Sequence, residues 1–421
     1  MASNEIINVN IFGQEIGRLG ISEDETRSSF QFNPDYLSSN SLQNIFPSTG
    51  IIKRTDYVQL FNQFDGETFK GIPPQFADSL PDVFGSIIFK AWLDSKNKGS
   101  ISVLEQLAYV GNRGMGALEF SPVVELPKNA AIDLDEVIEI LKDVLDLKRS
   151  TKQKNLNSDS LVNIFKIGSS AGGARPKILI SEHKDSGEII PGDVEYSNEY
   201  NHHLIKIATE DDGGYPREVV EYCYYLISRN IGIQMMESKL IDHKHFSTLR
   251  FDRRNGEKKH VLTASGMTGW DYKDQNHSSY ENLFKLSSFL KIPHTQLEAL
   301  YRRMIFNVVY GNNDDHLKNH SFIYNRENDS WSLSPAYDVT FSLNPLLNFK
   351  NTKRALSING KRSDISLKDV HAIAEHFTIK DPDRIIKEVE SQRSELLHLF
   401  EEHNVSKKVS ENIENYIVKL R

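Results

Sequence analysis

The chain has 421 residues, a length that predicts two or three structural units rather than one small core. Apolar residues make up 38% of it, enough for a globular core, and the net charge of −8 argues against broad electrostatic binding to nucleic acid or anionic membranes. The single cysteine, Cys223, excludes an internal disulfide framework and is expected to be buried. The chain shows no signal-peptide pattern and no run of the ~20 apolar residues that a membrane span needs, so we expect a cytoplasmic protein.

The first 125 residues are predicted to be rich in strands. Two runs of apolar residues, 6–12 and 15–21, lie on either side of a tight turn and predict a β-hairpin. The run SSFQF at 28–32 predicts a third strand. Helical spacing of apolar residues predicts helices over 81–95 and from Ser102, whose hydroxyl suits an N-cap.

The middle of the chain contains a boundary between predicted units. An acidic helix is expected over 133–147, and the following residues 148–160 contain one apolar residue, which predicts a flexible linker. We therefore divide the chain into a β-rich N-terminal subdomain (1–125), a second part of the N-terminal lobe (126–250) and a mainly helical C-terminal lobe (251–421).

Short strands around one helix are predicted between the linker and the C-terminal lobe. The helix covers 216–230, with Pro216 in its first turn and Gly232 just past its end. A glycine-rich segment, SSAGGARPK at 169–177, lies between the first two strands. The strand-like runs are 162–168, 177–182, 202–208 and 245–253.

The segment GNNDDHLKN at 311–319 places two carboxylates, a histidine, a lysine and three asparagines within nine positions. It begins where an apolar stripe through 297–308 predicts the end of a buried helix. Two short strand-like runs, SFIY and WSLSP, follow it and predict a hairpin. Such a hairpin returns Asp338 toward the loop.

These side chains suit phosphoryl transfer. Asn319 and Asp338 offer oxygen ligands, which Mg²⁺ prefers. Asp314, five residues before Asn319, is free to accept a proton from a hydroxyl group. Lys318 brings a positive charge to a phosphoryl group in transfer. The neighbouring Asp315 is expected to be structural.

The segments NNDDHLKNHSF and SPAYDVTFS resemble the catalytic segment of the HipA family of bacterial toxin kinases. Other parts of the chain resemble the family in the same order: VNIFGQEIGRL, FADSLPDVFG, LAYVGNRGMGALEF, SSAGGARPK and LRFDR. The resemblance spans roughly residues 6–345. It implies an α+β, two-lobed, protein-kinase-like fold with a β-rich N-terminal lobe and an all-helical C-terminal lobe, in which 126–250 is the nucleotide-cradling part of the N-terminal lobe.

The resemblance also implies roles for individual residues. Asp314 matches the catalytic base of the family, and Asn319 and Asp338 match its metal ligands. Lys206 matches the lysine that contacts the nucleotide phosphates. Glu221 is the expected ion-pair partner of Lys206, and several other acidic residues of the same helix are alternative partners. Ser170 matches a serine that the family autophosphorylates, although the adjacent Ser169 is open as the modified residue. The residues expected to bind the nucleotide are Gly172, Gly173, Ala174, Lys177, Lys206, Leu249, Arg250, Phe251, His316 and Tyr337.

Two features depart from familiar nucleotide sites. The segment SSAGGARPK fits neither the GxxxxGK[ST] nor the GxGxxG pattern. Leu249 stands where the family has a hinge acid, so the adenine contacts are expected to differ in detail. His316 is expected to brace the loop by hydrogen bonding rather than to act as a base.

The predicted activity is that of an ATP- and Mg²⁺-dependent serine/threonine protein kinase, the toxin of a type II toxin–antitoxin system. The resemblance implies a helix-turn-helix antitoxin partner, which carries the kinase to DNA, and a protein substrate in translation such as an aminoacyl-tRNA synthetase. One alternative is a catalytically silent pseudokinase that co-regulates transcription through the antitoxin. Another is a metal-dependent hydrolase or nuclease built on Asp314, Asp315 and His316, for which His202 and His203 are candidate extra ligands.

Overall fold

The computed structural model describes residues 5–39, 42–47, 49–81, 86, 101–123, 175–192, 197–209, 213–347 and 353–421. Several sequence predictions lie outside these residues, namely the helix over 133–147, the linker 148–160, the strand 162–168 and most of the helix over 81–95. Four predicted site residues also lie outside them: Ser170, Gly172, Gly173 and Ala174.

The N-terminal region forms an antiparallel five-stranded sheet, in the order β4-β3-β2-β1-β5. Its strands are β1 (Ile6–Ile11), β2 (Gln14–Ile21), β3 (Ser28–Phe32), β4 (Gln59–Phe61) and β5 (Leu118–Ser121). Alternate residues such as Ile7, Val9 and Ile11 are buried, because successive side chains of a strand point to opposite faces. The predicted hairpin and third strand are confirmed.

Three helices accompany this sheet: α1 (Pro34–Ser38), α2 (Pro74–Ala77) and α4 (Val103–Val110). The helix predicted from Ser102 is confirmed, and a capping box explains its start. The Ser102 hydroxyl accepts a bond from Glu105 N at 3.1 Å, and Ser102 N donates to the Glu105 carboxylate at 3.0 Å.

A second antiparallel sheet has the order β7-β6-β8-β10-β9. Its strands are β6 (Lys177–His183), β7 (Ile189–Pro191), β8 (Tyr200–Lys206), β9 (Ser238–Ile241) and β10 (His245–Leu249). Helix α7 (Arg217–Asn230) packs against β9 and β10. The predicted helix and the strands at 177–182, 202–208 and 245–253 are confirmed in kind. Cys223 in α7 is buried, as expected.

The C-terminal region is not all-helical, which corrects the expectation. It contains a three-stranded sheet in the order β13-β14-β15 and a small β11-β12 pair. The strands are β11 (Arg253–Arg254), β12 (Glu257–Lys258), β13 (Val261–Thr263), β14 (Ser321–Asn325) and β15 (Ser330–Leu333). The physical reason is that the β14–β15 hairpin needs a partner for its edge, and β13 supplies it through the pairing of Leu262 with Phe322.

Helices form the rest of the described C-terminal region. They are α8 (Ala264–Thr268), α9 (Tyr280–Phe289), α10 (His294–Val309), the 3₁₀ turn η2 (Leu317–Asn319), α11 (Leu367–His376), α12 (Pro382–Glu390), α13 (Arg393–Glu402) and α14 (Lys407–Glu414). The predicted stripe of α10 is buried, and Gly311 ends the helix at a left-handed φ of 68°. No helix among the described residues combines the length and the apolar character needed to cross a bilayer.

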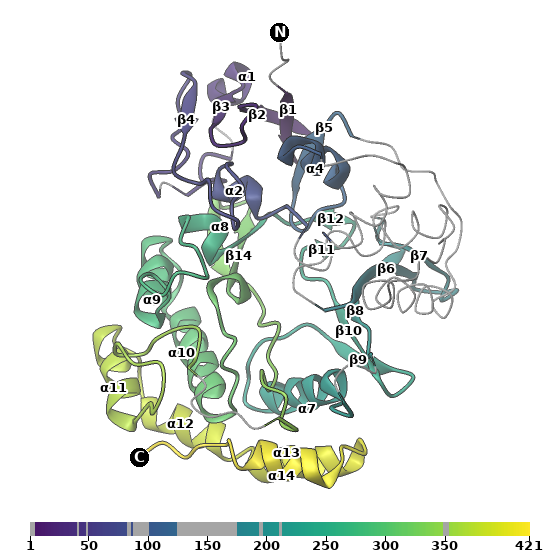
Figure 1. Cartoon of the computed structure of the whole chain (residues 1–421), viewed down its shortest axis with the longest axis vertical. Helices are drawn as coiled ribbons and strands as arrows, with labels where there is room; N and C mark the ends of the chain where they lie inside the picture. The colour runs from purple at the N-terminus through teal and green to yellow at the C-terminus, as the bar shows by residue number, and fades with distance from the viewer. Residues whose placement is uncertain are drawn as a thin grey trace.

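The sheet β1–β5 lies at one end of the molecule and helices α11–α14 lie at the other, with the second sheet on one side between them (Figure 1). The N-terminal region contacts the hairpin β14–β15 directly. Asn44 N donates to Asp329 Oδ1 at 2.9 Å, and Trp331 Nε1 donates to Asn44 O at 2.8 Å. These bonds attach the N-terminal region to the β13-β14-β15 sheet, whose strand β14 follows the segment 311–319.

Candidate active site

The polar loop 312–319 connects the buried helix α10 to strand β14. Asn312 fixes its start, because its Nδ2 atom donates to Asn307 Oδ1 at 3.1 Å and to Asp338 O at 3.3 Å. The second bond brings Asp338, beyond the β14–β15 hairpin, next to the loop. The hairpin therefore places Asp338 beside residues that precede it by more than twenty positions.

Asp314 and Asn319 are joined across the loop. Asn319 Nδ2 donates to the backbone oxygen of Asp314 at 2.8 Å, so the turn η2 holds the Asp314 backbone. The Asp314 side chain points outward and is 72% exposed. Reduced hydration in the loop raises the pKa of the Asp314 carboxyl, His316 opposes this rise, and the charge of Asp338 adds to it. His316 Nε2 lies 4.0 Å from Asp314 Oδ1.

Asp315 anchors the loop to the protein interior. Its carboxylate accepts bonds from Arg354 Nη2 and from the Tyr280 hydroxyl, both at 2.6 Å. Both Asp315 and Arg354 are almost completely buried. The Asp315 side chain therefore has a structural position, and the exposed Asp314 is the carboxylate of this pair that faces outward.

Lys206 at the end of β8 lies between two carboxylates from other elements. Its Nζ atom is 2.7 Å and 2.8 Å from the two Glu221 oxygens of α7, and it also contacts Asp338 Oδ1. Burial opposes its charge, but Asp338 and Glu221 together raise the pKa of Lys206. Burial likewise opposes the charge of Asp338, yet Lys206 and Lys177 hold the pKa of Asp338 well below its usual range. Lys206, Glu221 and Asp338 therefore form one partly buried ionic cluster beside Lys177.

The donor atoms near the loop fit a hard divalent cation. Asp338 is anionic and offers carboxylate oxygens to a cation. Asn319 uses its amide nitrogen for the bond to Asp314, so it offers its side-chain oxygen. Asp338 has a left-handed backbone with a φ of 54°, an uncommon conformation that recurs at functional sites. Two protein ligands are few, but Mg²⁺ commonly completes its shell with water and phosphate.

The two extra ligands suggested for a metal hydrolase, His202 and His203, have other partners in the structure. Across the described residues, no three His, Cys, Asp or Glu side chains lie close enough together to hold a metal ion. His202 and His203 instead contact serines of neighbouring strands, with His202 Nδ1 2.8 Å from Ser181 Oγ and His203 Nδ1 3.2 Å from Ser247 Oγ. Burial lowers the pKa of His202 to about 4, so this ring is neutral near pH 7.

The expected hinge lies between the second sheet and the C-terminal region. Leu249 ends β10, and Leu249 N donates to Glu237 O at 2.9 Å. The Phe251 ring lies against the Tyr337 ring, with 5.7 Å between their centroids. These two rings, which are distant in sequence, therefore form one aromatic surface near Asp338.

Arg250 has a structural contact that the sequence did not reveal. Its guanidinium group bonds both Asp252 oxygens, at 2.9 Å and 2.8 Å, and Arg253 Nη1 bonds the same carboxylate at 2.8 Å. Burial opposes ionisation of Asp252, but the two arginines hold its pKa far below the usual range. Asp252 Oδ2 also accepts from Gly116 N at 2.8 Å, which connects the hinge to the N-terminal region. Only the alternation of charges in LRFDRR could have signalled this cluster.

Lys318 and His316 both contact the Tyr272 ring. The Lys318 ammonium group lies 5.3 Å from the ring centroid, and the His316 ring lies 4.9 Å from it. The backbone oxygen of Lys318 accepts a bond of 2.8 Å from the Tyr337 hydroxyl. The Lys318 ammonium group thus lies against Tyr272, and Tyr337 supports the Lys318 backbone from the side of the hinge.

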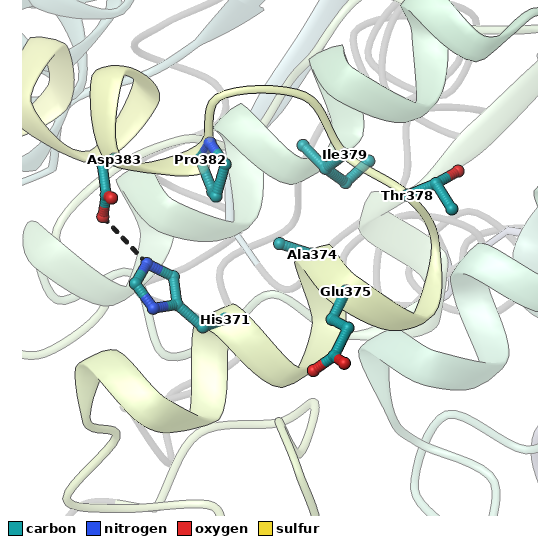
Figure 2. A pocket seen from close by; sticks show the side chains of 7 residues that line it. All are labelled: His371, Ala374, Glu375, Thr378, Ile379, Pro382 and Asp383. Atoms are coloured by element: carbon teal, nitrogen blue, oxygen red, sulfur yellow. Dashed lines mark hydrogen bonds and ion pairs between the residues drawn. The ribbon is translucent and has the colours of Figure 1, made fainter.

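A separate surface pocket of about 370 Å³ lies between α11 and α12, in a different part of the fold from the polar loop. His371 Nε2 lies 2.9 Å from Asp383 Oδ1 at its edge (Figure 2). The pocket is lined by His371, Ala374, Glu375, Thr378, Ile379, Pro382 and Asp383. The sequence did not indicate this pocket, and its lining shares no residue with the candidate active site.

Comparison with known proteins defines the class to which this fold and loop belong. Residues 169–396 match the HipA-like C-terminal domain, and residues 7–121 match the HipA N-terminal domain. The chain therefore belongs to the HipA family. A solved HipA from Shewanella oneidensis, in a complex with HipB and operator DNA, has the same fold, with a TM-score of 0.66 at 15% identity over 97% of this chain and 94% of that chain.

Two curated relatives are more similar in sequence over shorter stretches. A protein of Haemophilus influenzae named "Putative kinase" is 29% identical over 219 residues, which cover 45% of this chain and 58% of that protein. A Sinorhizobium fredii protein named "Putative kinase Y4dM" is 25% identical over 180 residues, or 37% and 43% of the two chains. The chain thus matches less than two thirds of the length of either relative.

Proposed function

We propose that the protein is an ATP- and Mg²⁺-dependent serine/threonine protein kinase and the toxin of a type II toxin–antitoxin system. The observation that carries this proposal is the partly buried cluster of Lys206, Glu221 and Asp338 beside the loop of Asp314. Protein kinases hold ATP with a lysine that is paired with a helix glutamate, and with an aspartate that binds the metal ion. The names of the two curated relatives support the same activity.

The proposed reaction is phosphoryl transfer to a hydroxyl group. The hydroxyl oxygen forms a bond to the γ-phosphorus of ATP, the bond from that phosphorus to the bridging oxygen breaks, and ADP leaves. Asp314 accepts the hydroxyl proton, a role that suits an exposed carboxylate with a raised pKa. Lys206 orients the phosphates, and we assign to Lys318, whose ammonium group lies against Tyr272, the positive charge that assists transfer. When bound, Mg²⁺ would be held by Asn319 and Asp338 and would neutralise phosphate charge.

The proposed nucleotide site extends from the cluster toward the hinge. Phe251 and Tyr337 offer an aromatic surface for the adenine. We assign contacts at its edge to the backbone carbonyl groups of Leu249 and Arg250, because the N–H groups of both residues already donate to Glu237 O and His202 O. We place the ATP phosphates between Lys177 and His316. Lys177 lies near Asp338, and His316 lies near Asp314. We assign the phosphate-covering part to Gly172, Gly173 and Ala174, with Ser170 as the autophosphorylation site.

We also propose partners for the chain. The Shewanella HipA is bound to HipB and operator DNA, and this chain has its fold over nearly its whole length. We expect a HipB-like helix-turn-helix antitoxin, with DNA reached only through it. The protein substrate is proposed to act in translation, for example as an aminoacyl-tRNA synthetase, so the kinase would act in the cytoplasm.

The test is incubation of the purified protein with Mg²⁺ and γ-labelled ATP, beside Asp314→Ala and Ser170→Ala, followed by mass-spectrometric mapping. We expect label at Ser170 in the wild type and none in Asp314→Ala, with the same far-UV circular dichroism in both proteins. Label elsewhere in wild type and Ser170→Ala would keep the kinase but reject Ser170 as its site. Undiminished transfer by Asp314→Ala would contradict the assigned base.

One observation favours a pseudokinase as the second candidate. The Asp338 carboxylate, a proposed metal ligand, contacts the Lys206 ammonium group directly, and this contact competes with a cation. A protein that binds ATP yet labels neither itself nor any protein of a cell lysate would fit this candidate. It would then act through the antitoxin in transcriptional control.

A further inference from the structure

The segment FADS at 76–79 places a carboxylate at the junction between the N-terminal region and the C-terminal region. Asp78 follows α2, and both of its carboxylate oxygens accept bonds from Thr263. Thr263 N donates to Oδ2 at 2.7 Å, and the Thr263 hydroxyl donates to Oδ1 at 2.8 Å. This two-point attachment joins residues that are 185 positions apart.

Thr263 in turn contacts the end of the polar loop. It is the last residue of β13 and the N-cap of α8, and its hydroxyl accepts a bond of 2.9 Å from Gly266 N. Thr263 pairs with Ser321 of β14, and Ala264 N donates to His320 O at 2.7 Å. His320 directly follows Asn319, and α8 packs against η2. Asp78 is therefore connected to the loop through one residue and its strand pairing.

The surroundings of Asp78 leave little freedom for its carboxylate. A Cβ atom at Gly266 would lie 2.4 Å from Asp78 Oδ2, so a glycine is required at this point of α8. Loss of hydration raises the pKa of Asp78, and the ammonium group of Lys318 opposes the rise. Lys318 is therefore near enough to influence this carboxylate. Asp78 approaches the polar loop from the side of the N-terminal region.

We infer that Asp78 is a positioning residue, which through Thr263 holds the loop 314–319 in place and so connects the N-terminal region to catalysis. It touches none of the reacting groups. The inference rests on the proposed kinase activity, but the position of the loop can be measured without it. A displacement of about 1 Å at a reacting group costs roughly a hundredfold in rate, so a loosened loop has a large effect.

The first experiment is hydrogen exchange of the full chain, compared by mass spectrometry between wild type, Asp78→Asn and Asp24→Asn. Asp24 is an exposed aspartate of the same region whose bonds are local, to Ser22 and Thr26. We expect at least tenfold faster exchange in peptides covering 314–320 for Asp78→Asn, with α7 unchanged, and no change for Asp24→Asn. Unchanged exchange in these peptides overturns the inference, whether or not the protein is a kinase.

The second experiment uses phosphoryl transfer and tests Asp78 and Thr263 together. We expect Asp78→Asn and Thr263→Val each to lower kcat by roughly ten- to a hundredfold with an unchanged KM for ATP, and the double variant to lose no more than either. Thr263→Ser keeps the hydroxyl and should restore kcat. Gly266→Ala, which displaces the carboxylate from the other side, should lower kcat alike. Additive losses of kcat in the double variant, or a lower Tm without a lower kcat, reject the positioning role. An inactive wild type rejects the proposed kinase activity, and the hydrogen-exchange experiment then tests the positioning role by itself.

Discussion

Asp314 and Asp315 are adjacent in the chain, yet 72% of the Asp314 side chain is exposed and only 1% of the Asp315 side chain is. The loop that follows α10 turns one carboxylate outward and directs the next into the interior. Asp315 meets a buried arginine and a buried tyrosine there, while the Asp314 carboxylate lies 4.0 Å from His316 Nε2. Asp315 thus stabilises the loop from the interior, while Asp314 is the carboxylate proposed to act on the substrate.

The same substitution is therefore expected to lower stability at Asp315 and phosphoryl transfer at Asp314. Asp315→Asn removes one charge of a buried ion pair and leaves Arg354 uncompensated, so we expect the free energy of unfolding to fall by roughly 3 kcal/mol. Asp314→Asn at the exposed position should change it by about 0.5 kcal/mol or less, while abolishing transfer. Urea unfolding followed by circular dichroism measures both. Equal stability losses in the two variants would contradict these separate roles.

The Lys206–Glu221 pair gives a prediction for ATP binding. Glu221→Gln keeps the shape of the side chain but leaves one neutral amide oxygen where two charged oxygens accept bonds from Lys206, so of these two partners only Asp338 remains anionic. One such bond is worth about 1.5–3 kcal/mol, which predicts binding of ATP weaker by roughly ten- to a hundredfold. Isothermal titration calorimetry measures the change. Glu218→Gln, one turn earlier on the buried face of α7, is the matched control, and an equal loss in both variants would assign the effect to the helix rather than to the pair.

The sequence was informative where the relevant contacts are local. The N-cap at Ser102, the β1–β2 hairpin and the stripe of α10 all depend on residues a few positions apart, and each is confirmed. The contact of Asp78 with Thr263 spans 185 residues and starts from the four-residue helix α2, so no periodicity announced it. Chain order identified Asp338 as a partner of the loop, but the sequence could not show that its carboxylate contacts Lys206.

The raised pKa of Asp314 predicts the acid side of the pH–rate profile. A base must be ionised to accept a proton, so transfer should rise with pH through a pKa above the ordinary 3.8 and then level off. His316 opposes the rise in the pKa, so His316→Gln should shift the midpoint to higher pH. Single-turnover transfer measured across pH tests both points. A midpoint that moves to lower pH in the variant would show that His316 does not stabilise the Asp314 carboxylate.

His260 gives a prediction for stability in acid. Its ring is fully buried, with Nε2 3.1 Å from Ile45 O and the Trp331 ring 5.3 Å away, and burial lowers its pKa from 6.5 to about 4. Between these two values the unfolded chain binds a proton that the folded protein does not, so the free energy of unfolding falls as pH falls. The stabilisation is complete above pH 6.5, and its loss by pH 4 amounts to roughly 3 kcal/mol.

The variant His260→Gln isolates this effect, because glutamine can still donate to Ile45 O but does not titrate. We expect its unfolding free energy to fall less steeply than that of wild type between pH 6.5 and pH 4. His202 and His320, whose pKa values burial also lowers to about 4, contribute to the slope of both proteins and cancel in the comparison. His243→Gln, which replaces an exposed histidine by the same residue, is the matched control. Parallel curves for wild type and His260→Gln would mean that the buried ring already accepts its proton in the folded state.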